Sequence, residues 1–391
     1  DFDRIVDRRN TKSLKYDFAE KRGMPKDLLP LWVADMDFRA APCIVEALQR
    51  RVSHGVFGYA RVPAAYYDAV TDWFARRHGW RIDLHWILYT TGVVPALSAV
   101  IKALTRPGDR ADACLQLFLL VDPQQRMRAI GQSAALRRRS VYDRLRRSGD
   151  EGFRSEGQAA FAVQSAQPRG PGVDPGGVAP PRRNMPPSRR ARRGGDILVV
   201  ADEIHCELTY EGHDYTPFAS LSDDFLHGSV TCNSPSKAFN LAGMQIANIV
   251  SADADVRTGI DRAINDNEVC DVNPFGVEAL MAAYDRGEEW LDRLREYLAD
   301  NYRMLCGFFA EYLPQYPVLP LEGTYLVWID CRTTGVSSEQ IAARLLAEAK
   351  LMISPGTIYG PGGEDFIRLN IACPRSLLEE GLLRLRKVLG R

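Results

Sequence analysis

Apolar residues recur along the chain at two spacings, which predict helices alternating with short strands. A spacing of three or four residues indicates helices beginning near Pro42 and covering residues 66–77, 94–104, 288–313 and 338–350. Short apolar runs bounded by turn residues predict strands at residues 87–92, 197–201, 229–232, 245–251, 324–330 and 366–371.

This alternation predicts an α/β fold with a mostly parallel sheet and a second, smaller α+β domain. We expect residues 46–279 to form the large domain, and residues 1–45 and 280–391 to form the small one. The N-terminal stretch up to Phe38 has an irregular, extended pattern. Within it, residues 31–38 are expected to face a ligand, with Trp32 and Ala34 at the substrate.

Composition narrows the range of partners. The chain has 391 residues and a formal net charge of zero, which gives no basis for binding nucleic acid or an anionic membrane. Eight scattered cysteines without a CxxC pair predict a reduced, cytoplasmic protein, and no apolar run is long enough to span a bilayer. We expect no metal site, and interpret His78 and His85 as structural or surface residues.

A lysine among hydroxyl and small residues, and an acid after an apolar strand, carry the strongest chemical signal. Lys237 lies in the run Ser234-Pro-Ser-Lys-Ala-Phe-Asn-Leu-Ala-Gly243, and Asp202 follows residues 197–201. The pair suits pyridoxal 5′-phosphate (PLP), because a lysine forms a Schiff base with its aldehyde and an acid keeps its pyridine nitrogen protonated. Taken singly, Lys237 would be a surface lysine and Asp202 a helix N-cap.

Further residues are candidates for holding the cofactor. The hydroxyls of Ser234 and Ser236 can donate to phosphate oxygens, and so can the backbone N–H groups of the turn at Gly92 and Val93. His205 can contact the cofactor ring or its phenolic oxygen, although a histidine packed on the domain wall is the alternative.

Two more candidates have an ordinary structural alternative. Tyr59 lies in a glycine-rich turn where its hydroxyl can reach a phosphate; otherwise it is a core aromatic residue. Arg368 lies in an apolar strand, where an unpaired charge is costly, so it needs an anionic partner. A substrate carboxylate held bidentately meets that need, and an internal ion pair is the alternative.

Several strings together resemble the fold-type I PLP enzymes of the class I/II aminotransferase superfamily, and more narrowly its cystathionine β-lyase (C–S lyase) branch. The resemblance covers the chain up to residue 109 and again from residue 196. The strings are Trp32-Val-Ala-Asp-Met-Asp-Phe38, Phe57-Gly-Tyr59, Thr91-Gly-Val-Val-Pro95, Asp202-Glu-Ile-His205, the lysine run, Gly287-Glu-Glu-Trp-Leu291, Glu322-Gly-Thr-Tyr325 and Arg368-Leu-Asn-Ile-Ala372.

The resemblance implies a fold-type I PLP transferase with a mostly parallel seven-stranded sheet, assembled as a homodimer with shared active sites. It implies that Lys237 is the Schiff-base lysine and general acid/base, and that Asp202 contacts the pyridine nitrogen. Tyr59 would reach the phosphate of the neighbouring subunit, and Arg368 would bind the substrate carboxylate. Gln245 stands eight residues after the lysine, where aspartate-type aminotransferases usually have arginine, and so favours the lyase branch.

Residues 110–195 depart from the family pattern. They are rich in arginine, proline and glycine, and they lack the expected ring-stacking aromatic residue and the asparagine turn; Tyr142 and Asn184 have no matching context. Several pieces can be read in a neighbouring frame as family-like strings, so we interpret the segment as a frameshifted translation. A divergent, flexible insertion is the alternative.

The expected activity is cleavage of a sulfur amino acid such as cystathionine to a thiol, pyruvate and ammonia, with a place in methionine biosynthesis. An aminotransferase is the alternative, because it would use the same key residues. A third possibility is an inactive or non-catalytic homologue, because the segment 110–195 lacks two expected cofactor contacts.

Overall fold

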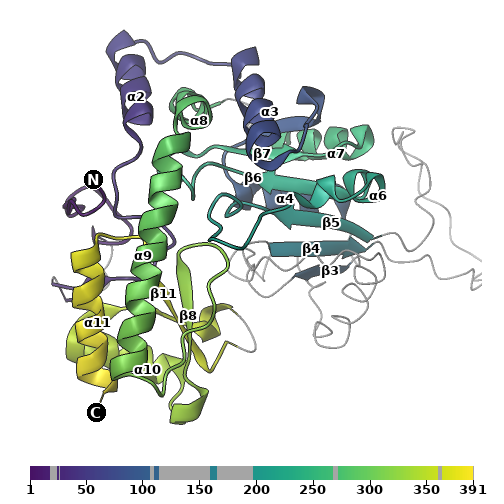
Figure 1. Cartoon of the computed structure of the whole chain (residues 1–391). Helices are drawn as coiled ribbons and strands as arrows, with labels where there is room; N and C mark the ends of the chain where they lie inside the picture. The colour runs from purple at the N-terminus through teal and green to yellow at the C-terminus, as the bar shows by residue number, and fades with distance from the viewer. Residues whose placement is uncertain are drawn as a thin grey trace, which may run out of the picture.

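The computed structural model describes residues 1–17, 24–25, 27–105, 110–113, 159–164, 197–266, 272–359 and 363–390. For residues 110–113, 159–164 and 197 only the backbone is described. Figure 1 shows a sheet with helices beside it and a second group of helices and short strands at the chain's C-terminal part. The interpretation of residues 110–195 falls outside the described residues, apart from two short strands.

The larger sheet has six described strands in the order β2-β7-β6-β5-β4-β3. Their bounds are β2 Ile87–Thr90, β3 Arg110–Ala113, β4 Ala159–Gln164, β5 Ile197–Asp202, β6 Ser229–Asn233 and β7 Ala247–Val250. The β5–β6 pair is parallel, and the other four neighbouring pairs are antiparallel. The prediction of a mostly parallel seven-stranded sheet is therefore corrected for the described strands.

The physical reason lies in the connections. Parallel neighbours need a crossover, usually with a helix, and the segment from β5 to β6 provides one through α6 (Asp223–His227). The chain instead runs from β6 to β7 through the lysine-bearing loop, residues 234–246, and pairs the two strands antiparallel. Strands β3 and β4 belong to the segment that departs from the family pattern.

Helices α4 (Val93–Leu104) and α7 (Ala254–Asn265) pack against each other and against this sheet. Their apolar faces form one hydrophobic cluster with the central strands, including Leu97, Ile260 and Val230. Gly92 ends the turn after β2 and begins α4, so the helix N-terminus lies at the sheet edge where β2 ends.

The C-terminal part has two small sheets: the parallel pair β1 (Leu29–Pro30) and β9 (Leu351–Met352), and the antiparallel sheet β10-β11-β8. The remaining strands are β8 Leu326–Asp330, β10 Ser354–Pro355 and β11 Phe366–Asn370. The remaining long helices are α2 Pro42–His54, α3 Ala64–His78, α8 Pro274–Arg286, α9 Glu288–Tyr312, α10 Ser338–Ala349 and α11 Arg375–Leu389.

A second, larger hydrophobic cluster joins these parts. It contains residues of α2, α3 and α8 together with Leu305 of α9, Leu345 of α10 and Leu382 of α11. Figure 1 shows α9 running from beside α8 down to α10 and α11. This cluster contains residues from both predicted domains, so it does not mark where one domain ends and the other begins. The predicted domain boundaries stay a prediction.

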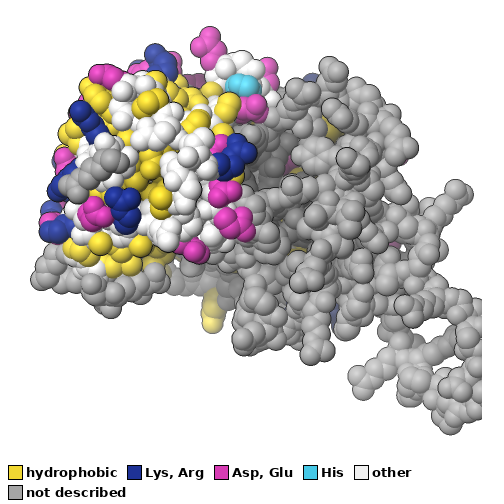
Figure 2. All heavy atoms as spheres, turned by 90° about the horizontal axis from the view of Figure 1, so that it is seen from below, with side chains coloured by type: hydrophobic (Ala, Val, Ile, Leu, Met, Phe, Trp, Pro, Cys, Tyr) yellow, Lys and Arg dark blue, Asp and Glu magenta, His cyan; other side chains and the backbone are white. Residues whose placement is uncertain are grey.

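The surface seen in Figure 2 mixes acidic and basic side chains with apolar ones across the described part. No single sign of charge dominates the coloured part of that face, in agreement with the formal net charge of zero. None of the helices that the structure describes is both long and apolar enough to cross a membrane.

Candidate active site

Three of the predicted site elements meet at one edge of the large sheet. Strand β5 ends at Asp202, which lies opposite Cys232 in the parallel neighbour β6. Strand β6 leads directly into the lysine loop, and β7 follows that loop. The first residue of β7 lies opposite Thr90, at the end of β2. The sheet register therefore brings Asp202, the lysine loop and the turn at Gly92 to the same edge.

The amine of Lys237 is held inside the protein. Its Nζ donates to the carbonyl oxygen of Ala34 at 2.6 Å, and the hydroxyl of Tyr325 donates to the same oxygen at 3.1 Å. Burial lowers the pKa of Lys237, and the positive charge of Arg368 lowers it further, while Asp35 and Asp202 act in the opposite direction. At neutral pH this lysine has a larger neutral fraction than an exposed lysine, as a nucleophile or base requires.

Asp202 is a buried carboxylate at the end of β5. Its Oδ1 accepts the backbone N–H of Ile204 at 3.1 Å. Burial raises the pKa of Asp202 to about 6, while this hydrogen bond and the charge of Lys237 act in the opposite direction. A cationic group beside Asp202 would favour the ionised carboxylate.

His205 packs against the residues just before β8. Its Nδ1 lies 3.1 Å from the hydroxyl oxygen of Thr324, and its ring meets the ring of Tyr325 edge to face at 5.8 Å between centroids. Burial lowers the pKa of His205 to about 3, and Lys237 and Arg368 lower it further, so the imidazole is neutral. Thr324 adopts φ 65, which is unusual for a β-branched residue and strains the backbone beside His205.

Arg368 is the candidate for binding an anion. It lies in β11, and its Nη2 donates to the carbonyl oxygen of Trp32 at 3.2 Å. Its guanidinium carbon lies 4.2 Å from the centre of the Tyr359 ring. Its Nε is buried without a hydrogen-bond partner, and burial lowers the pKa of the group. A buried donor without a partner suits a ligand that brings an acceptor.

The predicted phosphate donors occupy two places. Gly92 and Val93 stand at the N-terminus of α4, where the first backbone N–H groups of a helix have no intrahelical acceptor. Ser234 donates its hydroxyl to the carbonyl of Ile246 at 2.6 Å and accepts the N–H of Ser236 at 3.0 Å, so it braces the lysine loop. The hydroxyl proton of Ser234 is therefore not directed at a ligand in this arrangement.

Tyr59 is not brought to these residues within the chain. Its side chain is 95% exposed in the connection between α2 and α3, near the exposed Val56 and Phe57. This position contradicts the reading of Tyr59 as a core aromatic residue.

The acids that follow Asp202 anchor its loop. Glu203 is buried and accepts the hydroxyl of Tyr215 and the N–H of Phe218, the latter at 2.9 Å; burial raises its pKa to about 7. Glu207 accepts the indole N–H of Trp73 at 2.6 Å and lies 2.7 Å from Nε2 of His78.

His78 was interpreted as a structural or surface residue without metal-ligating neighbours, but two other potential ligands lie beside it. The potential ligand atoms of His78, Cys206 and Glu207 lie within 4.8 Å of one another. The same Glu207 oxygen lies at hydrogen-bonding distance from both Trp73 and His78. The three side chains therefore form a hydrogen-bonded group in the core. We interpret it as support for the loop that carries Asp202 and His205.

Three residues of this site were missed in the sequence analysis. Tyr325 shares the Ala34 carbonyl with Lys237, and the side-chain amides of Asn240 and Asn370 bind the backbone of residues 33–38. Their signal was present, because each lies in a string that carries the family resemblance. Asn240 also adopts φ 57, a conformation that asparagine tolerates better than most residues.

Comparisons with known proteins identify the family of the chain. The family model for aminotransferases of class I and II matches residues 175–385. Cystathionine beta-lyase PatB of Bacillus subtilis (strain 168) is 35% identical over 393 residues, covering 100% of both chains. Protein MalY of Escherichia coli (strain K12) is 28% identical and covers 98% of this chain and 97% of its own.

A solved structure gives the same result for the fold. The crystal structure of cystalysin from Treponema denticola, which contains a pyridoxal 5′-phosphate cofactor, superposes with a TM-score of 0.78. It is 25% identical and covers 100% of this chain and 98% of that one. The chain therefore belongs to the class I and II aminotransferase family. The predicted family and the fold-type I class are confirmed.

Proposed function

We propose that the chain is a PLP-dependent C–S β-lyase that cleaves a sulfur amino acid of the cystathionine type. The observation that carries the proposal is the convergence of two cations on one short segment. Lys237 binds the carbonyl of Ala34, and Arg368 binds the carbonyl of Trp32, two residues earlier. An amino-acid substrate needs this pairing, because its carboxylate is attached to the carbon that loses a proton.

The residues present fit PLP. A buried lysine amine suits the aldehyde, a buried carboxylate suits a protonated ring nitrogen, and the N-terminus of α4 suits a phosphate. The unpartnered Nε of Arg368 remains available for the substrate carboxylate. When bound, PLP supplies an electron sink that stabilises negative charge on the substrate Cα.

The chain's own groups then have distinct tasks. Arg368 binds and orients the carboxylate, and Lys237 takes the proton from Cα as general base. Asp202 holds a proton on the ring nitrogen by electrostatic attraction. Loss of the thiolate from Cβ, followed by hydrolysis, gives a thiol, pyruvate and ammonia. The relatives named cystathionine β-lyase support this reaction over transamination.

The first prediction concerns the products. Purified protein supplied with PLP and L-cystathionine is expected to release pyruvate without any added keto acid, measured by coupling to lactate dehydrogenase. A control with heat-denatured protein accounts for spontaneous decay. If amino-group transfer to 2-oxoglutarate occurs and no pyruvate appears, the chain is an aminotransferase. Absence of both reactions would support an inactive homologue.

A second proposal concerns assembly. We infer that the enzyme acts as a homodimer in which Tyr59 contributes to the partner's phosphate site, because its ring is exposed beside other exposed apolar residues. Tyr59→Phe is expected to weaken PLP affinity about tenfold by removing one hydrogen bond to a charged group. Equilibrium dialysis with PLP measures this change, and Tyr67→Phe serves as the control. A monomeric protein by sedimentation would refute the shared site.

The cellular setting is a further proposal. We propose a cytoplasmic enzyme of amino-acid metabolism, with a place in methionine biosynthesis because the reaction class releases a thiol amino acid from a thioether. Free cysteines throughout the described residues support a reducing compartment, and they are Cys43, Cys206, Cys232, Cys306, Cys331 and Cys373.

A further inference from the structure

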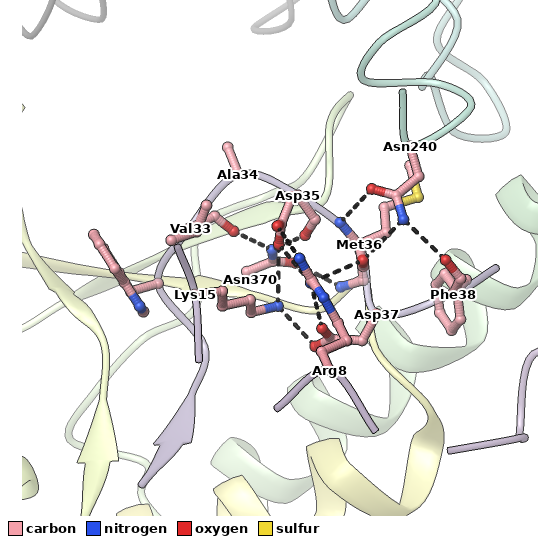
Figure 3. Close-up of polar contacts among 12 residues, drawn as sticks. Arg8, Lys15, Val33, Ala34, Asp35, Met36, Asp37, Phe38, Asn240 and Asn370 are labelled. Atoms are coloured by element: carbon pink, nitrogen blue, oxygen red, sulfur yellow. Dashed lines mark hydrogen bonds and ion pairs between the residues drawn. The ribbon is translucent and has the colours of Figure 1, made fainter. Parts of the chain in front are cut away.

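Residues 32–38 form a segment without regular secondary structure, and side chains from three other parts of the chain bind its carbonyl oxygens (Figure 3). The donors are Arg368 and Ser354 to Trp32, Asn370 to Val33 and Asp35, Lys237 and Tyr325 to Ala34, Arg8 and Asn240 to Met36, and Asn240 to Phe38. Buried carbonyl groups need partners, so these contacts fix the path of the segment.

The N-terminal arm supplies an ion cluster to the same segment. Arg8 contacts Asp35 at 2.6 Å and Asp37 at 2.7 Å, and Lys15 contacts Asp37 at 2.7 Å. The side chain of Lys15 is fully buried and that of Asp37 is 3% exposed. Two cations and two acids compensate one another there, and Figure 3 shows them gathered at the segment. We call Arg8, Lys15, Asp35 and Asp37 the ion cluster.

We propose that Arg8 and Lys15 are positioning residues that hold the carbonyl of Ala34 against the amine of Lys237. The proposal rests on the role given to Lys237 under the proposed function. Ala34 directly precedes Asp35, and Asp35 is bound at both its carboxylate and its carbonyl. A shift of Asp35 therefore moves the acceptor of the lysine amine.

This arrangement assigns a function to the N-terminal arm. Lys237 and Asn240 bind the segment from the lysine loop, Tyr325 and Asn370 bind it from the C-terminal part, and Arg8 binds it from the arm. The charge of Asp35 also favours the charged form of Lys237, more strongly than the charge of Asp202 does. A cluster that only anchored the arm would leave the reactivity of Lys237 unchanged.

The test compares Arg8→Gln with Arg9→Gln in the protein without PLP. Arg9 is a matched control because it forms an exposed pair with Asp7 and does not reach the segment. Trace acetic anhydride labels lysine amines, and mass spectrometry compares label on Lys237 with label on the exposed Lys387. Arg8→Gln is expected to raise the relative labelling of Lys237 about tenfold through local opening, and Arg9→Gln to leave it unchanged.

Two further variants test whether smaller changes to the ion cluster change the labelling of Lys237 less. Arg8→Lys keeps the charge without the forked contact, so its labelling is expected to lie between those of the wild type and Arg8→Gln. Asp35→Asn leaves the contacts of Asp37 intact and is the milder variant if Arg8→Gln does not fold. Unchanged Lys237 labelling in a folded variant overturns the proposal, even if hydrogen exchange of residues 32–38 becomes faster.

The unaltered chain provides a measurement that does not depend on any variant. At low urea concentrations, labelling of Lys237 and amide exchange of residues 32–38 should rise in parallel, because one opening exposes both. Independent rises contradict the proposal. Failure of the wild-type protein to attach PLP at Lys237 would refute the proposed function instead, and would leave the labelling comparison standing.

Discussion

Lys237→Ala is expected to abolish pyruvate release from cystathionine, lowering kcat by more than about 10³-fold. The variant loses both the covalent attachment to PLP and the base that takes the Cα proton. Its absorbance spectrum with PLP is expected to match that of free PLP, without the visible band of the lysine-bound cofactor. Stopped-time pyruvate assays and a PLP titration measure the two effects.

The fold should tolerate this change. Lys237 makes a hydrogen bond to Ala34 that Tyr325 also makes, so the backbone carbonyl keeps a donor in the variant. Burial of the lysine also opposes its charge, so its removal carries little loss of stability. Lys387→Ala, at an exposed position of α11, is the control and should retain full activity. A Lys237→Ala protein with the normal visible band would show that another lysine holds the cofactor.

The sequence predicted those parts of the fold that depend on local pattern. The helix expected at residues 288–313 is α9, which covers Glu288–Tyr312, because its apolar stripe is long and regular. Helices α7, α8 and α11 were not predicted. In α8 apolar and small residues lie on several sides, which weakens the contrast on which periodicity depends.

The candidate site was predicted as a set of residue types but not as an arrangement. Lys237 stood out through its hydroxyl and small neighbours, and Asp202 through its place after an apolar strand. Arg368 stood out because a charged residue in an apolar strand needs a partner. The contacts of Asn240 with Met36 join residues 204 positions apart, and no local pattern indicates such a pair. The strand directions were also beyond local pattern, because they depend on how connections cross the sheet.

Asp202→Asn is expected to have opposite effects on activity and on stability. It should lower kcat by about 10²–10³-fold, because a neutral amide cannot hold a proton on the ring nitrogen. In the protein without PLP it should raise the free energy of unfolding at pH 8, because the wild-type chain must keep a buried carboxylate ionised there. Pyruvate assays and urea unfolding at several pH values measure the two effects.

The sign follows from the pKa of Asp202, which burial raises from 3.8 to about 6 in the folded protein. Between these values the folded state binds more protons than the unfolded state, so stability falls as pH rises through this window. At about 1.36 kcal/mol for each pKa unit, the wild-type protein loses up to about 3 kcal/mol by pH 7. The Asn variant avoids that loss.

The difference in unfolding free energy between variant and wild type should therefore be small near pH 4 and reach its full size above pH 7. Glu203, whose pKa burial raises to about 7, adds a loss of the same sign in both proteins. The charge of Asp202 contributes to that raised pKa, so the loss from Glu203 is smaller in the Asn variant and adds to the difference. Asp214→Asn, which replaces an exposed carboxylate, is the control for the substitution itself. If the free energy of unfolding changes with pH at the same rate in Asp202→Asn and in the wild type, burial does not raise the pKa of Asp202. If PLP cancels the pH-dependent gain in unfolding free energy, Asp202 is kept for the cofactor at the expense of the fold. The reason is that a protonated ring nitrogen places a positive charge beside the carboxylate.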